Sequence, residues 1–168
     1  SLLPFVSVVM PGMAMLALVN IEPKSVQLTY FCLMITIPCV GDIFALYVGS
    51  TFKGPKLCPP VSPNKTISGA IGGLVGSLIA SLLVGLIAWA LAVQSRAVLP
   101  AWWHYVLLGL IGGVAGQLGD LFASLIKRHC GLKDFSNLFP GHGGMLDRLD
   151  SVLFMAIIIL CYRMLTVL

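Results

Sequence analysis

Five long apolar runs constrain this chain more than any other feature. They cover residues 2–19, 27–48, 69–93, 102–126 and 151–168. About 20 apolar residues in a helix span the hydrocarbon core of a bilayer. The composition agrees, because 58% of the residues are hydrophobic and 10% are charged, whereas soluble domains contain about 25% charged residues. The sequence therefore predicts an all-α, polytopic integral membrane protein with about five membrane helices, and it excludes a soluble domain and a disordered chain.

Two long polar loops, residues 49–68 and 127–150, alternate with two short ones, residues 20–26 and 94–101. Alternating spans place both long loops on the same side of the membrane. The long loops contain seven lysines and arginines, and the short loops contain two. The positive-inside rule therefore predicts that the long loops are cytoplasmic. The net charge of +4 is small and the basic residues form no stripe, so a nucleic-acid partner is not expected.

Glycines gather in two of the apolar runs. One run contains G-x-x-G-G-x-x-G from residue 69, and another contains G-x-x-G-G-x-x-G-x-x-G from residue 109. Such spacings let helix backbones approach closely in a membrane. The pattern has two interpretations. One is close packing, either within the chain or in a homodimer, and the other is a smooth helix face that accommodates a lipid chain.

Acidic residues are rare, and their positions indicate a functional region. The chain has six, and four of them lie within residues 120–150. Asp42 and Asp120 lie inside apolar runs, near the ends predicted to be cytoplasmic. An acid at that depth is costly in free energy and is a candidate functional residue; the alternative is a structural acid paired with a lysine or arginine. On a helix, Asp120 would share one face with Gln117 and Ser124, which predicts a polar stripe.

The loop at residues 127–150 combines groups that suit phosphate chemistry. Carboxylates from two elements can hold a hard divalent cation such as magnesium, and lysine and arginine bind phosphate oxygens. The glycine-rich turn at residues 140–144 would let backbone N–H groups approach an anion. Asp147 and Asp150 precede the last apolar run, where helix capping could explain Asp150 but not the whole cluster. Because these groups are next to membrane helices in the sequence, they predict phosphoryl or nucleotidyl transfer onto a lipid.

The same loop resembles a known family. From residue 124 to residue 150 the chain reads S-L-I-K-R-H-C-G-L-K-D-F-S-N-L-F-P-G-H-G-G-M-L-D-R-L-D. This stretch resembles the signature of phosphatidate cytidylyltransferases, also called CDP-diacylglycerol synthases. A second block resembles the same family through Asp42, Val48-Gly49, Lys56-Leu57 and V-S-P-N-K-T at residues 61–66. The resemblance implies an integral membrane enzyme that joins CTP and phosphatidate to give CDP-diacylglycerol and pyrophosphate.

The resemblance also implies an organisation and a set of site residues. Family members usually have additional N-terminal helices, so residues 1–168 are expected to form a single transmembrane catalytic domain, the C-terminal portion of a longer enzyme. Asp120 and Asp147 would be the carboxylates of the family's paired cation centre, with magnesium as one cation and room for a second. Lys133, Arg148 and Asp150 would complete the catalytic group. Substrate binding would involve Ser62, Pro63, Lys65, Thr66, Ser124, Lys127, Arg128, Asp134, His142, Gly143 and Gly144.

The chain departs from the family pattern at a few positions. Ser50 stands where Arg is usual, Ser68 and Ala123 stand where Glu is usual, and Lys53-Gly54 replaces a common Gly-Lys order. These changes affect secondary binding contacts and leave the cation carboxylates in place. Two alternatives stay open. One is a related membrane enzyme acting on another lipid, such as an isoprenoid-ether phosphate cytidylyltransferase or a polyprenol-type kinase, and the other is a non-catalytic membrane scaffold.

Overall fold

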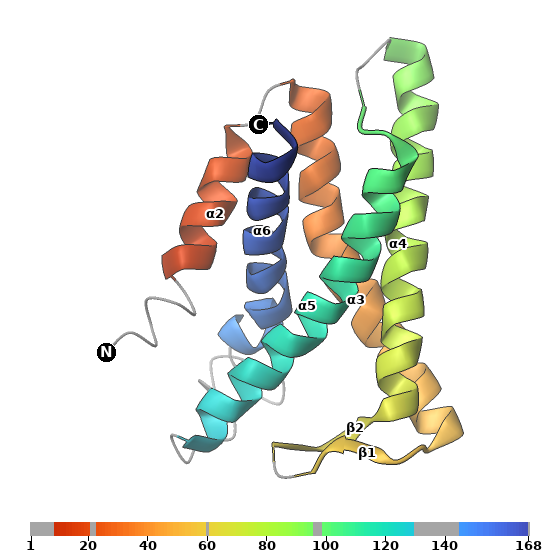
Figure 1. Ribbon diagram of the computed structural model, residues 1–168, viewed down its shortest axis with the longest axis vertical. Coiled ribbons are helices and arrows are strands. Elements are labelled where there is room, and N and C mark those ends of the chain that lie inside the picture. Colours follow the sequence, from red (N-terminus) through yellow and green to blue (C-terminus); the bar gives the residue numbers. More distant parts are fainter. Residues whose placement is uncertain (1–8, 21–22, 60, 96–98, 130–144, 168) are drawn as a thin grey trace.

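The computed structural model describes residues 9–20, 23–59, 61–95, 99–129 and 145–167, with the backbone alone at residues 63, 93–95, 145–150 and 167. The elements are α2 (Met10–Val19), α3 (Lys24–Phe52), β1 (Lys56–Cys58), β2 (Ser62–Thr66), α4 (Ile67–Ser95), α5 (Trp102–His129) and α6 (Met145–Val167). Figure 1 shows the helices running along the long axis of the molecule, with the two strands across one end.

Each described helix coincides with one of the predicted apolar runs, which confirms an all-α membrane fold. Three segments are long and apolar enough to cross a membrane, namely Lys24–Phe52, Ile67–Ala92 and Trp102–His129. The helix α2 and the Ser151–Thr166 part of α6 are shorter apolar helices. Three of the five predicted spans therefore meet this length criterion within the described residues.

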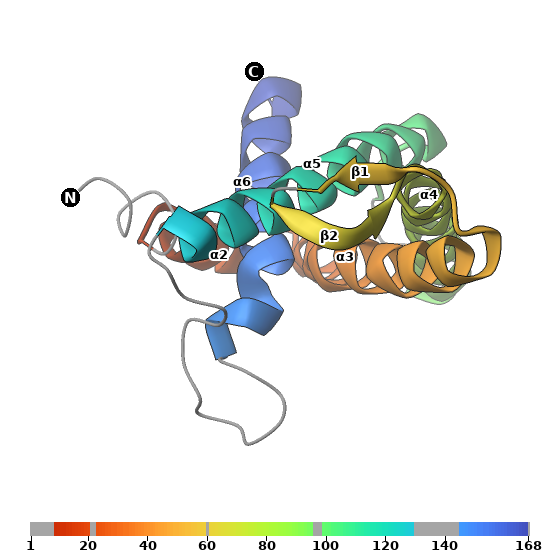
Figure 2. The same cartoon turned by 90° about the horizontal axis from the view of Figure 1, so that it is seen from below.

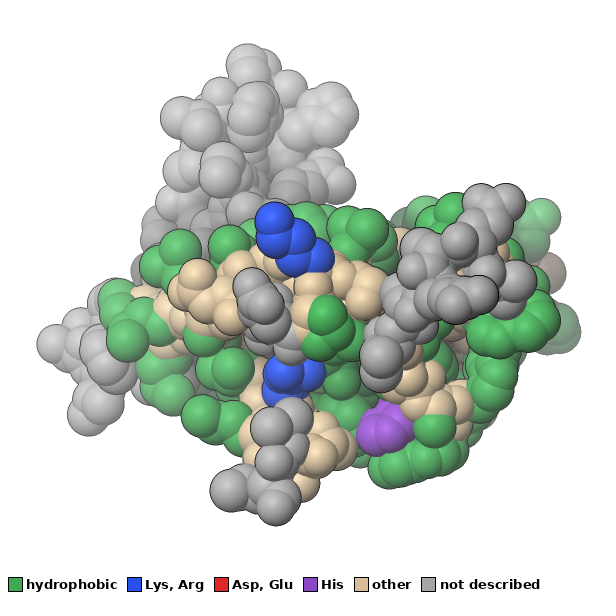
Figure 3. Space-filling model, turned by 90° about the horizontal axis from the view of Figure 1, so that it is seen from above, with side chains coloured by type: hydrophobic (Ala, Val, Ile, Leu, Met, Phe, Trp, Pro, Cys, Tyr) green, Lys and Arg blue, Asp and Glu red, His purple; other side chains and the backbone are tan. Residues whose placement is uncertain are grey.

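The outer surface of the helices is apolar, as a lipid environment requires. Leu46 and Tyr47 of α3 are each 74% exposed, and Leu16 of α2 is 69% exposed. Figure 3 views the end opposite the strands and shows hydrophobic side chains around much of the rim. Exposed apolar side chains in this number would be unfavourable in water and are favourable against lipid tails.

The long polar loop predicted at residues 49–68 is shorter than expected and contains a β-hairpin. The helix α3 continues to Phe52, an antiparallel hairpin of β1 and β2 follows, and α4 begins at Ile67. Lys56 pairs with Thr66 in this hairpin. Figure 2 shows the hairpin lying across the ends of α3 and α4 and reaching toward α5. Strands this short have almost no sequence periodicity, and they form because their pairing and the nearby helix ends stabilise them.

The glycine-rich faces of α4 and α5 pack against neighbouring helices of the same chain. A Cβ atom added to Gly72 would lie 2.5 Å from the Cβ of Val48 on α3, and one added to Gly113 would lie 2.9 Å from the Cβ of Ser77 on α4. Side chains at these positions would push the helices apart. The glycines of both patterns are buried, which confirms close packing within the chain.

Side-chain hydrogen bonds tie the three long helices together. Ser77 Oγ of α4 donates to the Ile37 carbonyl of α3 at 3.2 Å, and Ser81 Oγ of α4 donates to the Tyr105 carbonyl of α5 at 2.7 Å. Ile37 precedes Pro38, which lies inside α3 and has no backbone N–H. Pro38 therefore donates no hydrogen bond to the Met34 carbonyl one turn earlier, and the Ser77 bond joins α4 to α3 next to this interruption.

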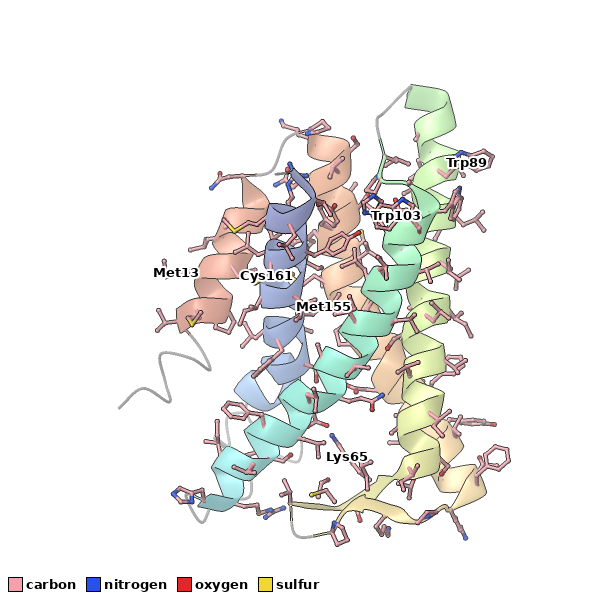
Figure 4. All side chains as sticks on the ribbon, in the orientation of Figure 1. Met13, Lys65, Trp89, Trp103, Met155 and Cys161 are labelled. Atoms are coloured by element: carbon pink, nitrogen blue, oxygen red, sulfur yellow. The ribbon has the colours of Figure 1, made fainter. Side chains whose placement is uncertain are left out.

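The hydrophobic core joins α6 to α3 and α5. The fully buried side chains include Leu33, Met34, Ile37, Leu108, Met155 and Ile159. A Cβ atom added to Gly112 of α5 would lie 2.6 Å from the terminal methyl carbon of Met155, and Figure 4 shows Met155 between α6 and α5. The packing holds the middle of α6, whose first residue lies toward the hairpin end of the molecule (Figure 1).

Candidate active site

A cavity of ≈ 740 Å³ lies at the hairpin end of the helices. One wall is a single face of α3, with Asp42, Ala45, Leu46, Gly49 and Ser50 at helical spacing, and Lys53 follows the end of the helix. The hairpin and the segment before it contribute Gly54, Lys56, Leu57, Asn64, Lys65 and Thr66, and the helices α4 and α5 contribute Gly69, Ala70, Gln117 and Asp120. The cavity therefore combines apolar walls with a few charged groups, which is typical of a ligand site.

Lys65 of β2 and Asp120 of α5 form an ion pair in this cavity. Their side chains are 27% and 30% exposed, so both charges are largely withdrawn from solvent and each offsets the cost of burying the other. Figure 4 shows Lys65 reaching from the hairpin toward α5. Asp120 therefore has a lysine partner, and this lysine comes from the second block that carries the family resemblance.

The neighbouring residue Gln117 helps to place Asp120 within the cavity. Gln117 lies one turn earlier on α5, and its Nε2 donates to the Ala70 carbonyl of α4 at 2.8 Å. This hydrogen bond fixes the face of α5 that presents Asp120, and it confirms that Gln117 and Asp120 share a face. Asp42, the other acid predicted to be a candidate functional residue, lines the same cavity from α3 and is exposed.

Thr66 caps α4 beside the cavity. Its Oγ1 accepts the Gly69 N–H at 3.1 Å, a bond that satisfies one of the unpaired donors at a helix start. Ser68 Oγ donates to Thr66 Oγ1 at 3.2 Å and accepts the Gly54 N–H at 3.3 Å. Two of the departures from the family pattern, Ser68 and Gly54, are therefore in contact, and together they link the segment after α3 to the start of α4.

The structure does not bring all predicted site residues to this cavity. The described residues Ser62, Ser124, Lys127 and Arg128 are not among those that line it. Pro63, Asp147, Arg148 and Asp150 lie in β2 and α6, but their side chains are outside the described part of the chain. Lys133, Asp134, His142, Gly143 and Gly144 lie outside the described residues altogether. The pairing of Asp120 with Asp147 in one cation centre therefore stays a prediction.

Lys53, Lys56 and Asn64 also line the cavity, and they are not among the predicted site residues, although Lys56 and Asn64 belong to the second block of the family resemblance. The signal that could have found the two lysines is the density of basic residues in the loop before α4. Together with Lys65, they surround the cavity with three ammonium groups, against the carboxylates of Asp42 and Asp120. Among the described lining residues, the charge balance therefore favours an anionic ligand rich in phosphate.

Comparison with known proteins shows the family of this chain. The model of the cytidylyltransferase family matches residues 1–166. A phosphatidate cytidylyltransferase of Bacillus subtilis is 42% identical over 130 residues, which are 76% of this chain and 44% of that protein. The protein of the same name from Brucella abortus is 40% identical over 111 residues, covering 66% of this chain and 38% of that protein. The one from Aquifex aeolicus is 35% identical over 146 residues, covering 87% and 51%.

These three alignments cover between 38% and 51% of the length of each relative. The chain therefore spans about half the length of the relatives it matches, or less. Because the family model covers the chain from residue 1 to residue 166, this chain belongs to the cytidylyltransferase family.

Proposed function

We propose that this chain forms the catalytic region of an enzyme that transfers the cytidylyl group of CTP to phosphatidate, giving CDP-diacylglycerol and pyrophosphate. Family membership and the name of the relatives support this class of reaction. The observation that carries the proposal is the contact of Lys65 with Asp120 in a lysine-rich cavity, because it brings a lysine of the second block of the family resemblance against the acid that the resemblance implies for the cation centre. The membrane helices beside the cavity suit a lipid substrate.

In the proposed reaction, a phosphate oxygen of phosphatidate attacks the α-phosphorus of CTP. A new oxygen–phosphorus bond forms, the bond from that phosphorus to the oxygen bridging to the β-phosphate breaks, and pyrophosphate leaves with the electron pair. The attacking oxygen is already anionic, so the reaction needs no general base. The protein has to orient two polyanions and neutralise their charge, a role that suits Lys65 and the proposed Lys133 and Arg148.

Magnesium belongs to the proposal, with Asp120 and Asp147 as its carboxylate ligands and a second cation beside it. Asp120 fits this role, because its carboxylate lines the cavity and is 30% exposed. The described residues contain no group of three His, Cys, Asp or Glu side chains that could hold a metal. Magnesium, however, is usually bound through one or two carboxylates, with water and substrate phosphates as its other ligands. When bound, it would neutralise phosphate charge, and Lys65 would exchange Asp120 for a phosphate oxygen.

The orientation in the membrane and the oligomeric state are further parts of the proposal. The apolar helices make this chain a membrane protein, and the excess of basic residues in the long loops supports a cytoplasmic hairpin end. A cytoplasmic site would meet CTP from the aqueous side and phosphatidate from the bilayer. In a homodimer, the contact would use helix faces other than the two glycine patterns, since those glycines are buried within the chain.

The test is an assay of the purified full-length protein in detergent with radiolabelled CTP. We expect labelled CDP-diacylglycerol only when phosphatidate and magnesium are both present, and we expect Asp120→Asn to lose it. Lys24→Gln, at the opposite end of α3, is the matched control and should retain the rate. Product from an isoprenoid-ether phosphate or a polyprenol in place of phosphatidate would support the related lipid enzymes. Absence of CTP turnover with every acceptor would support the scaffold alternative.

A further inference from the structure

Lys53 has an unusual backbone conformation at the wall of the cavity. It follows the last residue of α3 with φ 40° and ψ 47°, and its N–H donates to the Gly49 carbonyl at 3.2 Å. Within the described part of the chain, it is the one residue other than glycine with a positive φ. Glycine usually occupies this left-handed position after a helix, because a Cβ atom there crowds the following carbonyl oxygen and costs free energy.

The glycine that would relieve this strain is the next residue, and its position is used for a different contact. Gly54 donates its N–H to Ser68 Oγ at 3.3 Å. A Cβ atom added to Gly54 would lie 3.0 Å from Ser68 Oγ and 3.3 Å from Ser68 Cβ, closer than most real Cβ contacts. Exchanging the order of Lys53 and Gly54 would therefore remove one strain and introduce another. A glycine at position 53 as well would remove the strain without that clash.

The side chain of Lys53 offers a reason for the retained strain. Lys53 lines the cavity together with Lys56 and Lys65. Lys65 is already paired with Asp120, whereas among the described residues no carboxylate forms an ion pair with Lys53. Its ammonium group can therefore interact with a ligand in the cavity. Unfavourable backbone conformations of this kind cluster at functional sites, where the surrounding structure maintains them.

We propose that Lys53 is a phosphate-binding residue of this cavity, held in a strained conformation for that purpose. The proposal rests on the proposed function for the identity of the phosphate, which belongs to the nucleotide or to the headgroup of phosphatidate. A purely structural alternative is that the lysine stabilises the C-terminal end of the α3 dipole. The two readings predict opposite effects on stability when Lys53 is replaced by glycine.

The experiment compares the full-length wild-type protein with Lys53→Gly, Lys53→Arg and the control Lys24→Gln in detergent. Melting temperature is measured without ligand, and equilibrium binding is measured with inorganic pyrophosphate and with a short-chain phosphatidate. We expect Lys53→Gly to melt a few degrees higher, about 2 °C for a strain of this kind, and to bind one of the two probes about tenfold more weakly. Lys53→Arg should restore the binding, and Lys24→Gln should leave both quantities unchanged.

The probe that loses affinity identifies the source of the phosphate. Weaker pyrophosphate binding assigns Lys53 to the nucleotide, and weaker phosphatidate binding assigns it to the lipid headgroup. The proposal is overturned if both probes bind Lys53→Gly as they bind the wild-type protein, or if this variant melts at a lower temperature. Failure of the wild-type protein to turn over CTP would instead refute the proposed reaction, because the binding measurements do not depend on turnover.

Discussion

The ion pair between Lys65 and Asp120 allows a quantitative prediction for the ligand-free protein. Asp120→Asn keeps the shape of the side chain but leaves the ammonium group of Lys65, 27% exposed, without its counter-charge. Exposed ion pairs contribute about 0.2–1 kcal/mol, and removing one partner of a fully buried pair costs about 3–5 kcal/mol. Since less than a third of each side chain is exposed, we expect an intermediate cost, about 2 kcal/mol in the free energy of unfolding.

The assay is a double-mutant cycle on the purified protein in detergent, without CTP or magnesium. Denaturant unfolding is measured for the wild type, Asp120→Asn, Lys65→Met and the double variant. Removing both charges leaves no uncompensated ion, so the double variant should be more stable than the sum of the single effects predicts. We expect a coupling energy of about 1–2 kcal/mol. Additivity within about 0.3 kcal/mol would refute the reasoning, because the two charges would then not stabilise each other in the folded protein.

Three further predictions concern the cation, the membrane topology and the helix packing. Asp120→Asn and Asp147→Asn should each abolish turnover while the protein still inserts into the membrane; a near-normal rate in either variant at low magnesium would contradict a role in binding the cation. Thiol labelling of Cys58 and Cys130 in oriented vesicles should occur from the same side, and labelling from opposite sides would show that the topology is wrong. Gly72→Ala should lower the free energy of unfolding by about 1–3 kcal/mol, because its Cβ would lie 2.5 Å from the Cβ of Val48; unchanged denaturant unfolding would mean that α3 and α4 can separate without cost.

The sequence determined the helices, because the helical signal is local. In lipid each backbone polar group needs a partner within its own segment, so an apolar run of bilayer length has to be helical. The runs predicted at residues 69–93 and 102–126 correspond to α4 and α5, whose observed ends differ by only a few residues. The depth of Asp120 in such a run also marked it as a candidate functional residue before any neighbour was known.

Only the tertiary structure decided which side chains meet. The hairpin of β1 and β2 has no periodic signal, and its pairing depends on contacts with the ends of α3 and α4. Lys65 and Asp120 are far apart in the sequence, and their ion pair exists because the hairpin before α4 reaches across to α5 (Figure 2). The strained backbone of Lys53 is likewise decided by the contact of Gly54 with Ser68. These features depend on the distances between elements. Such distances are set by how the helices pack and cross, and they cannot be read from the local sequence.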